Sequence, residues 1–100
     1  MEFFVHLGIR TRSVRADVLN ANLVRLEIEA VKKLLALGTV RQAWKRANAH
    51  SVVLLVEALS ESECRAVLAT LPFSKAEILD IQMIAPVEPY LDVYANPLPD

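Results

Sequence analysis

Residues 17–38 read DVLNANLVRLEIEAVKKLLALG, and the rest of the fold can be worked out from this stretch. Its apolar side chains recur with the period of an amphipathic helix. They form two neighbouring stripes, one of Leu19, Leu23, Leu26, Ala30, Leu34 and Leu37 and one of Val24, Ile28, Val31 and Leu35. Gly38 follows the last apolar position and is a common residue just after a helix end. The pattern predicts a helix over residues 17–37.

Glu27 lies in the gap between the two apolar stripes. An acid in an apolar wall loses hydration, which raises its pKa toward the range where acid–base catalysis works best. We therefore expect Glu27 to be a general base, or else a buried acid neutralised by an arginine or a lysine for packing alone. Asn20 shares the line of Glu27 two turns earlier, where it either lines a pocket or caps the helix. The remaining charges lie on the opposite arc, at Arg25, Glu29, Lys32 and Lys33.

The sequence on either side of this helix predicts the order β-α-β-β-α-β. Asn48-Ala49-His50 is typical of a hairpin turn, because asparagine tolerates left-handed backbone. Ser60 and Glu63 form a capping box at the start of a second helix. The expected strands are residues 3–9, 39–48, 51–56 and 77–85, and the second helix runs from 60 to 71.

This order predicts an α+β fold of the ferredoxin-like βαββαβ type: a four-stranded antiparallel sheet with two helices on one face. The first and third strands are expected in the centre, because their residues are apolar almost throughout. The other face would expose Phe4, Ile78, Ile84 and one side of residues 52–56. An exposed apolar surface of this kind indicates a partner, and sheet-to-sheet packing of two copies gives a symmetric dimer.

The chain divides into a domain and a tail. Residues 1–86 are expected to form the ferredoxin-like α+β domain. Residues 87–100 are rich in proline and are expected to be extended and to contact a neighbouring subunit.

Composition argues against several classes of protein. The chain has 100 residues, is 54% hydrophobic and carries a net charge of −1. The balanced charge argues against a nucleic-acid or membrane partner, and no apolar run reaches the ~18 residues of a membrane span. The single cysteine, Cys64, excludes an intramolecular disulfide and is expected to be a buried structural thiol. No histidine has metal-ligand spacing, and no glycine-rich loop offers a phosphate site. Without a signal peptide, the cytoplasm is the expected compartment.

Several short motifs recur at a characteristic spacing: Met1-x-Phe3-x-Val5, Glu27 in the first helix, Gly38 six residues before Trp44, Leu71-Pro72-Phe73, and Asp80-Ile81 with Pro86. In this combination the chain resembles the muconolactone delta-isomerase family over most of residues 1–90. It departs from the family at Lys45, where the family has arginine, and Arg46 comes one place later. The hairpin after Trp44 is shorter and lacks the family's glycine, and Arg65 stands where some members have histidine.

The resemblance implies a dimeric α+β barrel and a cofactor-independent isomerase or cyclase. The family reaction moves a double bond in a lactone by proton transfer and needs neither a metal nor a redox cofactor. For this chain it implies a lactone-like or polyketide-like small molecule, Glu27 as general base and acid, and a homodimer or higher homo-oligomer. Two alternatives stay open: a cofactor-free oxygenase of the same structural group, and a non-catalytic small-molecule-binding or oligomeric module.

Five further residues are candidates for the site. Lys45 and Arg46 are placed to stabilise an oxyanion or to bind a carboxylate, but they point to opposite faces of one strand, so at most one serves. Trp44 is either a core residue or a wall of the substrate site. His50 is a candidate catalytic residue, or an exposed histidine in a turn. Phe73 is a candidate substrate contact in the Leu-Pro turn.

Overall fold

The computed structural model describes residues 1–10 and 19–91, and its elements follow the predicted order. Residues 17–18 of the predicted helix and 92–100 of the predicted tail lie outside the described residues. None of the helices in the described part of the chain is long and apolar enough to cross a membrane. The strands are β1 (Glu2–Ile9), β2 (Val40–Lys45), β3 (Ser51–Glu57) and β4 (Leu79–Val87), and the helices are α1 (Ala21–Leu37), α2 (Glu61–Ala69) and α3 (Pro72–Lys75).

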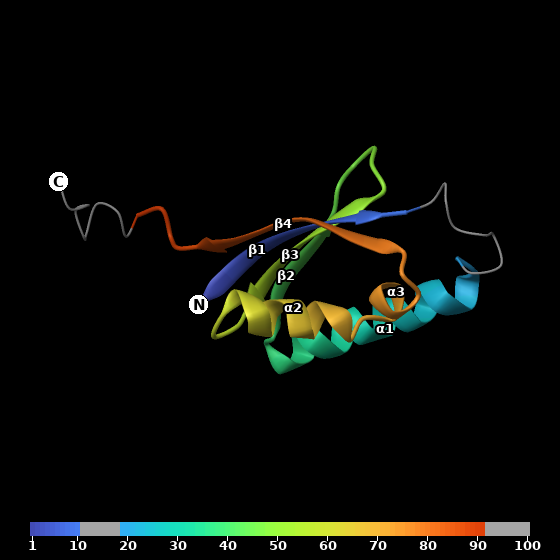
Figure 1. Cartoon of the computed structure of the whole chain (residues 1–100), viewed down its shortest axis with the longest axis horizontal. Coiled ribbons are helices and arrows are strands. Elements are labelled where there is room, and N and C mark those ends of the chain that lie inside the picture. Colours follow the sequence, from blue (N-terminus) through green and yellow to red (C-terminus); the bar gives the residue numbers. More distant parts are fainter. Residues whose placement is uncertain (11–18, 92–100) are drawn as a thin grey trace.

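The four strands form one antiparallel sheet in the order β2-β3-β1-β4. β1 and β3 are therefore central, as their apolar sequences predicted. Both long helices lie on one face of the sheet (Figure 1). The predicted α+β, ferredoxin-like architecture is confirmed.

The core lies between the helices and the inner face of the sheet, which is the face toward them. Side chains of β1 alternate between the two faces, so that Phe3, Val5 and Leu7 are buried against the helices. β3 adds Leu54 and Val56, which pair with β1 in register. This alternation puts one continuous apolar layer under both helices.

α1 begins at Ala21, later than residue 17, where the periodicity predicted its start. Asn20 has extended backbone angles, and its side-chain oxygen accepts a hydrogen bond from the Leu23 N–H at 2.9 Å. Those two features define a helix N-cap, which the apolar stripe alone does not reveal. At the other end Gly38 adopts the left-handed conformation, with φ 79°, as its position predicted.

The second predicted helix, residues 60–71, corresponds to α2, and the short α3 follows it as an element that was not predicted. The capping box is confirmed, because the Ser60 hydroxyl accepts a hydrogen bond from the Glu63 N–H at 3.1 Å. α2 ends at Ala69, and Leu71 is extended (φ −68°, ψ 140°). Pro72 then opens α3 at the first helical position, where a missing N–H costs nothing.

A β-bulge in β4 corrects the faces predicted for that strand. The pairing with β1 shifts between His6 and Leu7 and leaves Gln82 without a partner. Beyond the bulge the alternation is displaced by one residue, so Ile84 packs against the core instead of facing outward. Ile78, also predicted on the outer face, is buried just before the strand.

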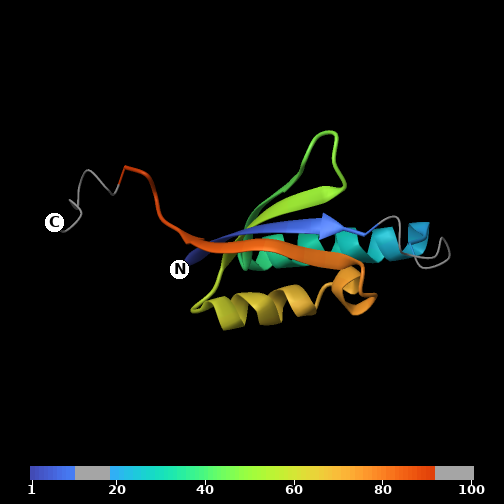
Figure 2. The ribbon, with the colours of Figure 1, turned by 45° about the horizontal axis from the view of Figure 1, so that its top comes forward.

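The outer face of the sheet, on the side away from the helices, nevertheless remains apolar. The strand pairings place Phe4, Val53, Leu55, Trp44 and Met83 on it. Trp44 is 50% exposed and Met83 is 53% exposed. Figure 2 shows the two long helices on the opposite side. The surface from which a dimer was predicted is therefore present: Phe4 and one side of residues 52–56 lie on it as expected, whereas Ile78 and Ile84 do not. The dimer itself stays a prediction.

Candidate functional site

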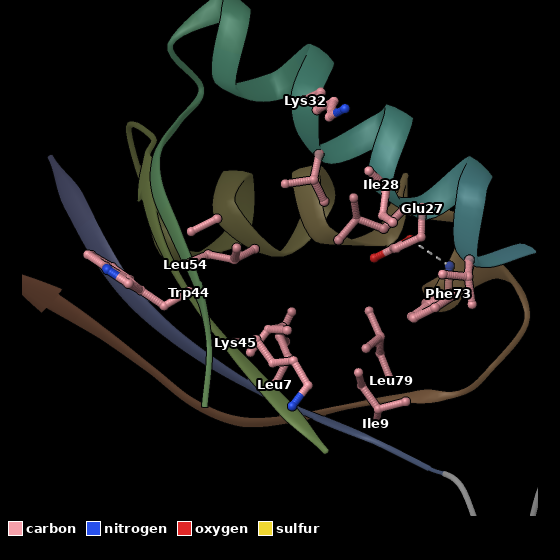
Figure 3. Close-up of a pocket in the computed structure, with 15 residues that line it drawn as sticks. Leu7, Ile9, Glu27, Ile28, Lys32, Trp44, Lys45, Leu54, Phe73 and Leu79 are labelled. Atoms are coloured by element: carbon pink, nitrogen blue, oxygen red, sulfur yellow. Dashed lines mark hydrogen bonds between the residues drawn. The ribbon is translucent and has the colours of Figure 1, made fainter. Parts of the chain in front are cut away.

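A cavity of about 370 Å³ lies between α1 and the inner face of the sheet (Figure 3). Strands β1, β2 and β3 provide one wall, α1 provides the other, and α3 with the start of β4 closes one end. Small-molecule sites occupy roughly 300–1,000 Å³. The cavity is thus large enough for a small organic ligand.

The cavity wall is apolar apart from three ionisable side chains in the described part of the chain. These are Glu27 and Lys32 from α1 and Lys45 from the end of β2. No group of three or more histidine, cysteine or acidic side chains that could hold a metal ion occurs among the described residues. Apolar contacts with a ligand would come from Leu7, Ile9, Ile28, Leu54, Phe73 and Leu79.

Glu27 extends from α1 toward the start of α3. The backbone N–H of Phe73 donates a hydrogen bond to Glu27 Oε1 at 3.0 Å. The other carboxylate oxygen points into the cavity (Figure 3). One oxygen is therefore bound to the protein, and the other faces the space that a ligand would fill.

The surroundings of Glu27 favour its protonated form more than water does. Burial raises the pKa of Glu27 above its usual value, and the Phe73 N–H opposes part of that rise. Among residues 1–10 and 19–91 no lysine or arginine forms an ion pair with Glu27. Glu27 is therefore held by a backbone donor at the start of α3, while it also lines the cavity.

Lys45 lies where β2 runs into the hairpin. Its ammonium donates hydrogen bonds to the carbonyl oxygens of Arg46, at 3.3 Å, and Ala49, at 3.2 Å. An ammonium has three N–H donors, so one remains for a ligand. Because carbonyls hold Lys45 without neutralising it, a positive charge stays beside the cavity.

Lys32 is a cavity residue that the sequence did not single out. The helical pattern placed it on the solvent arc, and its side chain is indeed exposed. Lys32 follows Ile28 by one turn, on the flank of the second apolar stripe. This spacing could have indicated that Lys32 borders the cavity, because a lysine beside an apolar stripe can lay its aliphatic chain along apolar surface.

Phe73, predicted to contact substrate, lines the cavity and is 7% exposed. Trp44 borders the cavity through its position on β2, but its indole lies on the other side of that strand (Figure 3). With half its surface exposed, Trp44 is not a core residue of this chain. The Trp44 ring therefore lies on the outer face of the sheet.

Three other candidates do not line the cavity. Arg46 lies near the outer face, where its Nη1 is 3.4 Å from His6 Nε2. His50 is exposed in the hairpin, and its carbonyl accepts the Ile9 N–H at 2.8 Å. Asn20 caps α1. Strand alternation turns Arg46 away from the cavity, and the capping bond holds Asn20 at the start of α1, so neither joins Glu27 in the cavity wall.

These observations define a small ferredoxin-like α+β domain with a carboxylate-bearing apolar cavity between helix and sheet. The model of the muconolactone delta-isomerase family matches residues 1–93. The chain belongs to the muconolactone delta-isomerase family, as its motifs indicated. No curated protein sequence gives a significant match.

Two solved structures are similar to this chain in fold. A crystal structure of muconolactone isomerase has a TM-score of 0.69 and 21% sequence identity, covering 87% of this chain and 88% of that one. The second is 5-chloro-2-hydroxyhydroquinone dehydrochlorinase from Burkholderia phenoliruptrix AC1100, in complex with 2,5-dihydroxybenzoquinone. Its TM-score is 0.65 and its identity 15%, covering 88% of this chain and 94% of that one.

Proposed function

We propose that this protein is a cofactor-independent isomerase or cyclase that transfers a proton at Glu27 on a lactone-like or polyketide-like small molecule. The observation that carries the proposal is the environment of Glu27: a half-buried carboxylate without a cation partner among the described residues, with one oxygen facing an apolar cavity. A carboxylate in this setting is a stronger base than one in water.

The residues divide the reaction between them. Glu27 removes a proton from the carbon next to a carbonyl group, and the electrons of the C–H bond move to the carbonyl oxygen. The ammonium of Lys45, or that of Lys32, stabilises the negative charge on this oxygen. Protonated Glu27 then returns the proton to another carbon of the same ligand, so the double bond shifts and no atom is gained or lost.

The names of the two structural relatives are compatible with this chemistry. One is an isomerase, and the other is a dehydrochlorinase bound to a quinone. A double-bond shift and the loss of hydrogen chloride both begin when a base removes a proton. The shared fold thus suits a base in the cavity next to a ring-shaped carbonyl compound.

The assembly that we propose is a homodimer or a higher homo-oligomer. The apolar outer face, with Trp44 and Met83 half exposed, supports sheet-to-sheet packing of two copies. The segment after β4 supports a contact with a neighbouring subunit, because Tyr90 and Leu91 are largely exposed and the chain there leads away from its own domain (Figure 1). The cytoplasmic location stays a prediction from the sequence.

The test is exchange of carbon-bound hydrogen in D₂O. The purified protein is mixed with a panel of unsaturated lactones and enolisable cyclic ketones, and deuterium uptake is followed by NMR and mass spectrometry. We expect uptake and a double-bond shift with the wild type and neither with Glu27→Gln. Glu29→Gln is the matched control, because Glu29 lies on the same helix, is exposed and pairs with Arg25 at 2.9 Å.

Other results would point elsewhere. Undiminished exchange in Glu27→Gln would refute the role of Glu27. Consumption of dissolved oxygen on mixing would favour the oxygenase alternative. Tight binding of ligands without exchange would favour the non-catalytic module.

A further inference from the structure

The contact between Glu27 and Phe73 joins two parts of the chain that are 46 residues apart. The donor is a backbone N–H in the first turn of α3, where an N–H has no partner within its own helix. Glu27 is its acceptor. Figure 3 shows the bond crossing from α1 to the Phe73 backbone at one end of the cavity.

The Phe73 N–H is held in place by the segment around it. Pro72 is the first residue of α3 and limits the backbone there. The Phe73 carbonyl accepts the Ile78 N–H at 3.0 Å, and the Ser74 hydroxyl donates to the Leu68 carbonyl at 2.7 Å. Phe73 and Ile78 are also buried in the core. The donor therefore cannot move away without unpacking α3.

A fixed donor has a chemical consequence for Glu27. The two oxygens of a free carboxylate are equivalent, and its side chain can rotate among several staggered conformations. Here Oε1 is bound and the other oxygen faces the cavity, so a single oxygen in a single orientation meets the ligand. Fixed orientation of a base lowers the barrier to proton transfer.

We infer that the Phe73 backbone N–H is a positioning group for Glu27, which fixes the carboxylate so that only its cavity-facing oxygen acts as the base. This inference rests on the proposed function. The positioning residue acts through Glu27 and needs no contact between its own N–H and the ligand. The Leu71-Pro72-Phe73 motif thus serves the chemistry as well as ending α2.

The same N–H favours ionised Glu27, because it donates to the charged carboxylate. Burial acts in the opposite direction and is the larger effect. Loss of the N–H would therefore raise the pKa of Glu27 further.

The first experiment uses the intact protein and needs no substrate. In a pH titration by ¹H–¹⁵N NMR, we expect the Phe73 amide proton to move downfield as Glu27 ionises and to show no such step in Glu27→Gln. Glu29→Gln should keep the step. A Phe73 amide that titrates identically in wild type and Glu27→Gln would overturn the inference.

The second experiment removes the Phe73 donor, and it also makes the Pro72 carbonyl, which accepts the Ala76 N–H at 3.0 Å, a weaker acceptor. The chain has one cysteine, Cys64, so a 1–63 thioester can be ligated to a synthetic 64–100 peptide with phenyllactate in place of Phe73. This ester keeps the ring and deletes the N–H. We expect the pKa of Glu27, followed by ¹³C NMR of its carboxyl carbon, to rise relative to the all-amide ligated protein. Phe73→Leu keeps the N–H but removes part of the ring that buries Glu27, so it should not reproduce the rise that the ester causes.

The catalytic arm uses the compound that shows Glu27-dependent exchange. With the ester protein we expect kcat to fall about 10-fold, KM to stay constant and the acid limb of kcat/KM to move to higher pH. Loss of stability with an unchanged titration would show a purely structural role and refute the inference. If no compound exchanges, the proposed function fails, whereas the two NMR titrations still decide the positioning of Glu27.

Discussion

The two long helices cover the same face of one sheet, but they pack against it differently. α2 buries Cys64 and Leu68 almost completely, whereas no residue of α1 is buried to that degree. The half under α2 is closed, although Ala30, Val31 and Leu34 of α1 also pack against the core. The open half under α1 leaves the cavity and exposes Glu27 to it. The most tightly packed helix residues and the candidate catalytic residue are therefore on different helices of the same layer.

The largest effect should come from Glu27 in the open half. We expect Glu27→Gln to lower kcat/KM for the exchange substrate by about 10²–10⁴-fold, the usual contribution of a positioned acid–base group. The glutamine oxygen can still accept the Phe73 N–H, so the fold should be retained. Steady-state kinetics with a circular-dichroism melt checks both expectations, and Glu29→Gln should match the wild type in each. Equal rates in Glu27→Gln and Glu29→Gln would show that Glu27 has no special role in the reaction.

The closed half should respond in stability instead. Leu68→Ala should destabilise the protein by about 2–5 kcal/mol, because Leu68 is 2% exposed and its removal leaves a cavity in the core. Ile28→Ala on α1 should change the free energy of unfolding by no more than about 0.5 kcal/mol, because Ile28 is 50% exposed. Urea unfolding of both variants measures the difference. A larger loss for Ile28→Ala would show that α1 is packed more tightly in solution, for example by a partner.

Lys45 and Arg46 are neighbours at the end of β2, but only Lys45 lines the cavity, so variants of the two test the assignment of the site. Lys45→Ala should lower kcat by about 10²-fold, as removal of an oxyanion-stabilising donor does. Arg46→Ala should leave kcat unchanged, because Arg46 does not line the cavity and lies beside His6. Equal losses in the two variants would contradict this assignment. A loss in Lys32→Ala but not in Lys45→Ala would transfer the role to Lys32.

The smallest expected effect is the pH dependence of stability that Glu27 contributes. Because burial raises its pKa in the folded state, Glu27 is less destabilising when protonated than when ionised. Its favourable contribution is complete below the pKa of an unfolded glutamate and is lost as pH rises through the higher folded value. Glu27→Gln should therefore melt higher than wild type at neutral pH, and the difference should vanish in acid. Paired melts across pH measure this, and a constant difference would argue against a raised pKa.

Much of the site was predictable where it depends on local pattern. Helical periodicity singled out Glu27, strand alternation separated Lys45 from Arg46, and the Leu-Pro turn pointed to Phe73. Features that depend on distant pairing were missed. The bulge at Gln82 reversed the second half of β4, because an extra residue in one strand is defined only by its partner strand.

The sequence by itself determined the βαββαβ order, the ferredoxin-like topology and the presence of an acid between two apolar stripes, because each follows from the spacing of residues along a helix or strand. The tertiary structure alone decided that Glu27 meets the Phe73 N–H, that Lys32 lines the cavity and that α1 leaves an open space over the sheet. Those outcomes depend on how separate elements pack together, and no local pattern encodes the distance between them.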